Sequence, residues 1–273
     1  MQTVVTYATT LLDTEIHFYV RGNAKQYLIC FYGYGQNATV FDELAAYLKD
    51  THTLLIVDLP FHGANMHKKG FEWTAAHTNA LTAYFKKQFN IQSYSILAYS
   101  IGARIALSIF EQDFTAVEKF YLLAPDGVFN SRFFKFITGN RLGQALMYSF
   151  IHFPHIVFGI INLLAFTHIL DAASKRLYMS TTHSQLKRRR LSYFWNCVHQ
   201  LDFSKVLKSY LLQNPKEQEK ILLFYGIHDP IINEKHLLKS LDAFSNIKKN
   251  ELACGHNIFN PSIFPIVLKK AFS

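Results

Sequence analysis

Five short apolar runs, separated by segments with helical spacing, constrain the fold of this chain more than any other feature of its sequence. The runs are QYLICFY (26–32), THTLLIVDLP (51–60), YSILAY (94–99), FYLLAP (120–125) and ILLFYG (221–226). Apolar residues recur at helical spacing over 38–49, 72–89, 101–111 and about 258–271. Buried strands that alternate with helices predict an α/β fold, with a mostly parallel sheet covered by helices on both faces. The alternating N-terminal residues predict an antiparallel hairpin at one edge of that sheet.

Residues 127–205 interrupt this alternation, because they contain several helical stretches and no convincing strand. The same segment carries ten Lys or Arg and two Asp or Glu, whereas the rest of the chain carries 18 and 17, so most of the net charge of +9 lies here. A basic helical segment within a nearly neutral α/β chain suggests a separate role. We therefore predict one α/β core, residues 1–126 and 206–273, with a helical insertion at 127–205.

Three sequence features together predict a cytoplasmic protein: the N-terminal residues, the most apolar window and the spacing of the cysteines. The first residues alternate like strands and lack the charged and apolar regions of a secretory leader. The most apolar window, about 146–170, is interrupted by His152, Pro154 and Asn162 among others, which favours packed helices over a membrane span. The three cysteines, Cys30, Cys197 and Cys254, include no CxxC pair and are typical of free thiols in a reducing compartment.

The sequence LAYSIG places Ser100 at the corner between a buried strand and a helix. Small residues flank the serine at the positions where strand and helix backbones approach most closely, Ala98 and Gly102. Such a corner points the hydroxyl away from the sheet and leaves the Ile101 N–H at a helix N-terminus, where it can stabilise negative charge. The pattern is that of a nucleophile elbow, G-x-S-x-G, with alanine for the first glycine.

A serine nucleophile needs a histidine base and an acid that orients the histidine, and both follow Ser100 in the expected order. Asp229 comes directly after the strand ILLFYG, in IHDPIIN, and His256 lies in CGHNIF before the last helix. Both belong to loops at carboxyl ends of strands, where α/β sheets place their sites. Asp126, after the strand at 120–124, remains an alternative acid.

These motifs resemble those of the α/β-hydrolase superfamily, in its capped, single-domain serine hydrolase branch, over about 1–126 and 206–273. FYGYGQN resembles the HGxxG oxyanion loop, with Tyr32 for the usual histidine. VDLPFHGAN resembles DLPGHGxS, with Phe61 for a glycine, and GIHDPIIN and CGHNIF resemble the acid and histidine loops. The resemblance implies the α/β-hydrolase fold, and it implies that the insertion at 127–205 is a helical cap.

The resemblance also implies a mechanism. Ser100 would attack an acyl carbonyl, His256 would take its proton, and Asp229 would hold the imidazole. The backbone N–H groups of Tyr34 and Ile101 would bind the oxyanion. This chemistry needs no cofactor, and no His, Cys or Asp spacing in the sequence resembles a metal site. The candidate substrate contacts near this centre are Tyr99, Arg104, Phe129 and Phe133.

The favoured reading is a serine hydrolase for an ester or thioester with an apolar acyl part. YSIGARIAL also resembles the elbow segment of the menaquinone-pathway SHCHC synthases, so a carbon–carbon lyase is one alternative, and it would use Arg104. A catalytically silent ligand-binding protein is the other alternative. The expected partner is a small acyl substrate, not nucleic acid. The basic run KRRR (187–190) makes contact of the cap with an anionic membrane or substrate a further hypothesis.

Overall fold

The computed structural model describes residues 4–12, 14–129, 132–166, 175, 179 and 182–272 of the 273-residue chain. Its Cα positions form two compact units, each described here by itself. The sheet unit consists of Met1–His67, Trp73–Phe129 and Gln200–Ser273. The helical unit consists of Lys68–Glu72 and Asn130–His199. The helical unit thus includes most of the segment that the sequence distinguishes by its charge.

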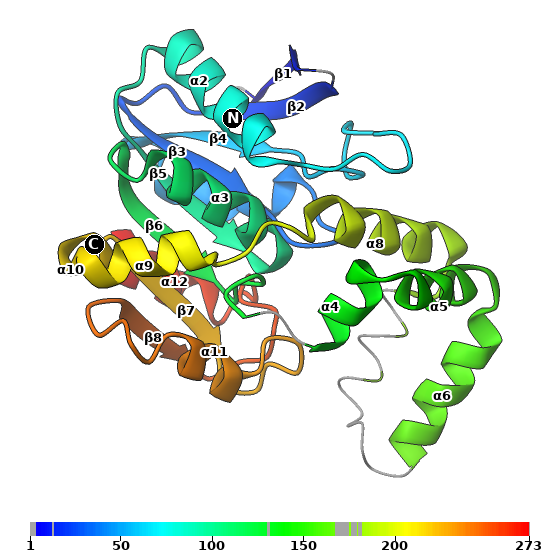
Figure 1. Cartoon of the computed structure of the whole chain (residues 1–273). Helices are drawn as coiled ribbons and strands as arrows, with labels where there is room; N and C mark the ends of the chain where they lie inside the picture. The colour runs from blue at the N-terminus through cyan, green and yellow to red at the C-terminus, as the bar shows by residue number, and fades with distance from the viewer. Residues whose placement is uncertain are drawn as a thin grey trace. The chain divides into compact units, whose positions relative to one another are not determined.

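The sheet unit is built on an eight-stranded sheet in the order β1-β2-β4-β3-β5-β6-β7-β8 (Figure 1). Strands β3 to β8 pair in parallel, and β1 and β2 form an antiparallel hairpin at one edge, as predicted. The strands are β1 (Val4–Leu11), β2 (Thr14–Arg21), β3 (Gln26–Phe31), β4 (His52–Val57), β5 (Tyr94–Tyr99), β6 (Val117–Leu123), β7 (Ile221–Gly226) and β8 (Lys248–Leu252).

Helices cover both faces of this sheet, as two neighbouring residues of β6 make clear. Successive strand residues point to opposite faces. Phe120 contacts Phe110 of α3 with ring centroids 5.0 Å apart, and Tyr121 contacts Phe272 of α12 at 4.6 Å. Helices α3 and α12 therefore lie on opposite faces. Every residue of β5 and β7 is buried, which explains why these strands are continuous apolar runs.

The helices of the sheet unit follow the predicted segments with shifted ends. They are η1 (Ala38–Phe41), α1 (Asp42–Tyr47), α2 (Ala75–Phe89), η2 (Ser100–Gly102), α3 (Ala103–Asp113), α9 (Lys205–Gln213), α10 (Pro215–Gln218), α11 (Glu234–Ser240) and α12 (Phe264–Phe272). Two local signals set the ends of α2. Thr74 and His77 form a capping box at its start, and Asn90 takes a left-handed conformation at its end.

The helical unit contains α4 (Arg132–Gly139), α5 (Arg141–His152), α6 (Pro154–Phe166) and α8 (Gln185–Val198). The side chains of Asn140 and Ser184 accept hydrogen bonds from the first turns of α5 and α8, which fixes where these helices begin. Gly143 allows α4 and α5 to pack closely, since a Cβ there would lie 2.0 Å from the Phe136 carbonyl oxygen. None of the described helices combines the length and the apolar character needed to cross a bilayer.

Candidate active site

Ser100 occupies a strained corner between β5 and the helix that follows it. Its φ of 51° lies in the left-handed region, which is rare for residues other than glycine. Gly102 makes the corner feasible, because a Cβ there would lie 2.4 Å from the Tyr32 carbonyl oxygen and 2.9 Å from Phe31 Cβ. The chain therefore turns against β3 and holds the serine at the carboxyl end of the sheet.

His256 lies four residues beyond the end of β8, and its ring faces Ser100. Its Nε2 is 2.8 Å from Ser100 Oγ. The Tyr99 hydroxyl donates to the His256 carbonyl oxygen at 2.8 Å, and the two rings pack with centroids 5.4 Å apart. Burial raises the pKa of Tyr99, and nearby Asp229 raises it further, so this hydroxyl stays a donor at neutral pH. Tyr99, a candidate substrate contact in the sequence, thus holds the histidine loop.

Asp229 completes a chain of hydrogen bonds from the serine. Its Oδ2 lies 2.7 Å from His256 Nδ1, and its Oδ1 accepts from the N–H groups of Ile231 at 2.8 Å and Ile232 at 2.9 Å. The side chain of Asp229 is 1% exposed. Each oxygen therefore has a defined partner, which orients the carboxylate toward the imidazole.

The loops that carry Asp229 and His256 are joined directly to each other. The His228 N–H donates to the Cys254 carbonyl oxygen at 3.0 Å. At Gly226 a Cβ would lie 2.5 Å from the carbonyl oxygens of both Cys254 and Gly255, so only glycine lets the loops approach this closely. The glycine at the end of β7 thereby contributes to the spacing between acid and histidine.

This geometry allows general-base activation of a serine hydroxyl. When His256 Nδ1 carries the proton and donates to Asp229, Nε2 is unprotonated and can accept the proton of Ser100. The same Nε2–H can later protonate a leaving group. The arrangement is chemically suited to acyl transfer through a covalent serine intermediate.

The loop after β3 and the turn after β5 lie at the same edge of the sheet. Phe31 of β3 pairs with Ala98 of β5. Tyr34 lies three residues after Phe31, and Ile101 lies three residues after Ala98. His62 supports the first loop, because its Nε2 accepts from the Gly35 N–H at 3.0 Å while its Nδ1 contacts the Pro60 carbonyl oxygen at 2.9 Å.

At two positions, Tyr32 and Phe61, the sequence differs from the family motifs. The Tyr32 hydroxyl donates to Asp58 Oδ1 at 2.6 Å, and burial together with the Asp58 charge raises the pKa of Tyr32. Asp58 is fully buried. Phe61 keeps a φ of 61° at the position of the motif's glycine, which costs on the order of 1–2 kcal/mol of backbone strain.

Arg104 and Asp126 form an ion pair with each other, and the arginine side chain is buried. Arg104 Nε and Nη2 each lie 3.0 Å from one Asp126 oxygen, and Nη1 donates to the Leu201 carbonyl oxygen at 2.9 Å. The Arg104 side chain is 1% exposed. This burial speaks against Arg104 as a substrate contact and weakens the lyase alternative that needs it. Asp126 pairs with Arg104, and the carboxylate that contacts His256 is that of Asp229.

Breaking this ion pair is expected to destabilise the fold. Replacing Arg104 with methionine leaves Asp126 without its cation, which should lower the free energy of unfolding by about 2–3 kcal/mol, below the full cost of a buried pair because Asp126 is 23% exposed. Urea denaturation measures the loss. The double variant Arg104→Met/Asp126→Asn should recover part of it. A loss below about 0.5 kcal/mol, the size of an ordinary surface substitution, would contradict the prediction.

Of the remaining candidate substrate contacts, the structure describes the side chain of Phe129. The ring of Phe129 packs against His236 of α11 at 5.8 Å, and the side chain of Phe133 lies outside the described residues. Within the described part of the chain, no three His, Cys, Asp or Glu residues gather in a way that could hold a metal ion. The three cysteines are free thiols.

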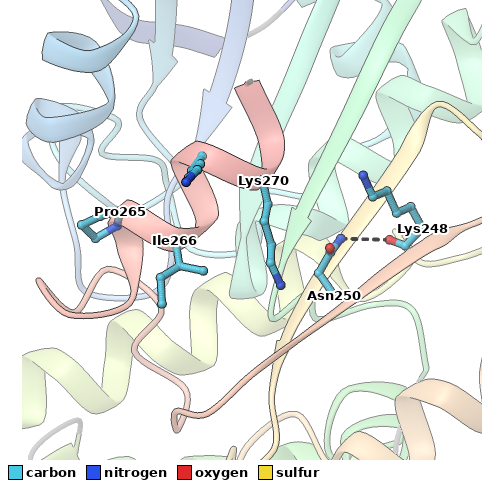
Figure 2. Close-up of a pocket in the computed structure, with 6 residues that line it drawn as sticks. Lys248, Asn250, Pro265, Ile266 and Lys270 are labelled. Atoms are coloured by element: carbon cyan, nitrogen blue, oxygen red, sulfur yellow. Dashed lines mark hydrogen bonds between the residues drawn. The ribbon is translucent and has the colours of Figure 1, made fainter.

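A basic hollow of about 720 Å³ lies elsewhere on the sheet unit, between β8 and α12 (Figure 2). Its lining is formed by Lys248, Asn250, Pro265, Ile266, Lys269 and Lys270. Figure 2 shows Lys270 extending toward Asn250, whose side-chain amide donates to the Lys248 carbonyl oxygen at 3.4 Å. None of the residues that contact Ser100 lines this hollow, so its size does not mark the reactive centre.

Comparisons with known proteins agree with the fold. The family profile described as alpha/beta hydrolase fold matches residues 26–260. No curated protein matches the sequence. Among solved structures, an alpha/beta hydrolase enzyme from a Medee basin deep-sea metagenome library superposes with a TM-score of 0.69 at 17% identity, covering 96% of each chain.

Two further solved structures have similar scores. A structure from a study of carboxylesterases of Nitrososphaera gargenis gives a TM-score of 0.65 at 14% identity, and an enol-lactonase from Burkholderia xenovorans gives 0.64 at 15%. Each comparison covers 97% of both chains. At these identities the likeness establishes the fold alone.

Proposed function

Because the chain belongs to the alpha/beta hydrolase fold family, we propose that it is a serine hydrolase that cleaves a carboxylic ester or thioester with an apolar acyl part. The observation that carries this proposal is the continuous chain of hydrogen bonds from Ser100 through His256 to Asp229, with distances of 2.8 Å and 2.7 Å. A binding protein has no need for a serine paired with a histidine that is itself paired with a carboxylate. The geometry therefore supports catalysis over silent binding.

The proposed reaction has two halves. Ser100 Oγ attacks the acyl carbonyl carbon as its proton passes to His256 Nε2, and the N–H groups of Tyr34 and Ile101 stabilise the oxyanion. The carbon–oxygen or carbon–sulfur bond then breaks, and the His256 proton goes to the leaving alcohol or thiol. Water, deprotonated by His256, attacks the acyl-enzyme, and the carboxylic acid leaves as Ser100 regains its proton. Asp229 holds the imidazole throughout.

The preference for an apolar acyl part rests on the composition of residues 142–166. This stretch of 25 residues contains no Asp, Glu, Lys or Arg. Ligand sites for acyl chains are lined mainly by apolar and aromatic side chains. The sequence supplies such side chains in excess of what one small group of helices needs for its own core.

A fluorophosphonate probe tests the proposal, because it reacts covalently with activated serines. We expect stoichiometric labelling of the native protein, with the added mass on the peptide that contains Ser100. Ser95 and Ser108 are also buried, and they serve as internal controls that should stay unlabelled. Loss of labelling after heat denaturation would show that activation depends on the fold. A folded protein that does not react, or that reacts at another serine, would contradict the proposed function.

A further inference from the structure

The helical unit exposes an unusual amount of apolar surface. Among the described residues, this unit supplies half of the large apolar side chains that are exposed, although it makes up about a quarter of the chain. The most exposed is Phe166, at 81%. Extended apolar patches on a protein surface mark interaction sites. The exposed apolar side chains of this unit are therefore candidates for a binding surface.

The exposed side chains lie on α5 and α6 in regular positions. On α5, Gly143, Met147 and Ile151 form the buried side, while Leu142 and Leu146, four residues apart, are 64% and 51% exposed. Residues four apart share one face of a helix. Both leucines are thus presented together beside the packed face of α5.

The exposed apolar surface continues beyond α5. Phe153, the single residue between α5 and α6, is 49% exposed, and Leu163 on α6 is 60% exposed. Leu163 and Phe166 lie three residues apart, so they share one face of α6. The described part of α6 has 13 residues, and apolar segments of this length occur in protein cores and at membrane interfaces.

Cations accompany this apolar surface within the same unit. Residues 130–199 contain nine Lys or Arg and one Asp. Lys187 and Arg189 are exposed on α8, and Arg141 is exposed at the start of α5. A surface that combines exposed apolar side chains with an excess of positive charge is complementary to an anionic bilayer, which offers hydrocarbon below a layer of phosphate.

One arginine of the run KRRR, Arg188, is buried and has a structural role. Arg188 is 4% exposed, and its guanidinium donates to the carbonyl oxygens of Thr182 at 2.8 Å and Ile151 at 3.2 Å. It therefore anchors α8 to the end of α5. Of the other cations of this run, Lys187 and Arg189 are exposed and Arg190 is half-buried.

We propose that the helical unit docks on the surface of an anionic lipid bilayer. The apolar side chains of α5 and α6 enter the interface, and the cations of α8 contact the phosphate groups. The proposal concerns binding alone. It can therefore hold or fail independently of the hydrolase activity proposed above.

Vesicle sedimentation tests the proposal on the full chain. Vesicles of phosphatidylcholine mixed with phosphatidylglycerol should bind the protein, and added salt should weaken the binding. Phosphatidylcholine alone should bind it about 10-fold or more weakly. The variant Leu163→Ser/Phe166→Ser should bind the anionic vesicles about 100-fold more weakly, because it removes apolar contact. The variant Lys187→Gln/Arg189→Gln should lose about 10-fold.

A matched control separates a docking surface from general net charge. Lys248→Gln/Lys270→Gln removes two positive charges from the basic hollow of Figure 2 and should change binding less than about twofold, since the proposal assigns binding to side chains of the helical unit alone. Circular dichroism and thermal melting would verify that each variant folds. Absence of binding to anionic vesicles, or equal loss in the control, would overturn the proposal. So would sedimentation velocity showing that Leu163 and Phe166 hold two copies of the chain together.

Discussion

Replacing Ser100 with alanine is expected to lower kcat/KM for an activated acyl ester by about a millionfold. The substitution removes the only atom that can form the acyl-enzyme in the proposed mechanism, while His256 and the oxyanion-binding amides remain. Folding should be preserved, because alanine and serine experience the same strain at a φ of 51°. Initial rates with a nitrophenyl ester series, together with probe labelling, measure the effect.

A control for this variant lies on the next helix. Ser108 of α3 is also buried, at 6% exposed, and Ser108→Ala should leave kcat/KM within about threefold of the wild type because it is remote from His256. If Ser100→Ala retains more than about a hundredth of the activity, a nucleophile other than Ser100 carries the reaction. The mechanism proposed here would then be wrong.

Replacing Asp229 with asparagine should lower kcat/KM by about 10⁴-fold. The amide can donate its N–H to His256 Nδ1, which favours the tautomer with the proton on Nε2. Nε2 then cannot accept the proton of Ser100. The loss should appear in kcat with little change in KM, since Asp229 is buried behind the histidine.

Asp126→Asn is the matched control, since it makes the same chemical change at the other candidate acid. It weakens the ion pair with Arg104, so it should lower the melting temperature while kcat of the folded enzyme stays within about threefold. Asp229→Asn should therefore lose kcat, whereas Asp126→Asn should lose thermal stability. A large loss of kcat in Asp126→Asn with full activity in Asp229→Asn would reverse the assignment of the acid.

The sequence predicts the central strands well because they are buried on both faces. An apolar run such as ILLFYG leaves few alternatives to a buried strand, and β7 occupies those residues, Ile221–Gly226. Strand β8 is not among the apolar runs, and the sequence indicates it only as the strand before the histidine loop, because it is KKNEL, an edge strand in which only Asn250 and Leu252 are buried. Its charged residues face solvent and hide the strand pattern.

Helix ends were less predictable than helix existence. The last helix begins at Phe264 and not near residue 258, because residues 258–263 form turns that return the chain from the histidine loop. The segment 38–49 begins as the 3-10 helix η1 before it continues as α1. Such differences depend on local hydrogen bonds that apolar periodicity does not record.

The order of Ser100, Asp229 and His256 along the chain, and their places at strand ends, were visible in the sequence. The contacts that position them were not. The Tyr99 hydroxyl meets a carbonyl oxygen 157 residues away, and Arg104 meets Asp126 22 residues away. No periodicity or motif reports which distant polar groups a buried side chain will find, so Tyr99 and Arg104 could be identified only as residues near the centre.

The two ends of the helical segment meet within the sheet unit. The Phe203 N–H donates to the Gly127 carbonyl oxygen at 2.8 Å, and Arg104 holds Asp126 and Leu201 beside this bond. A chain that lost everything between Phe129 and Gln200 would need only a short turn to reconnect, because closing a short gap costs little entropy. The sheet unit can therefore accept segments of very different length and composition at this point.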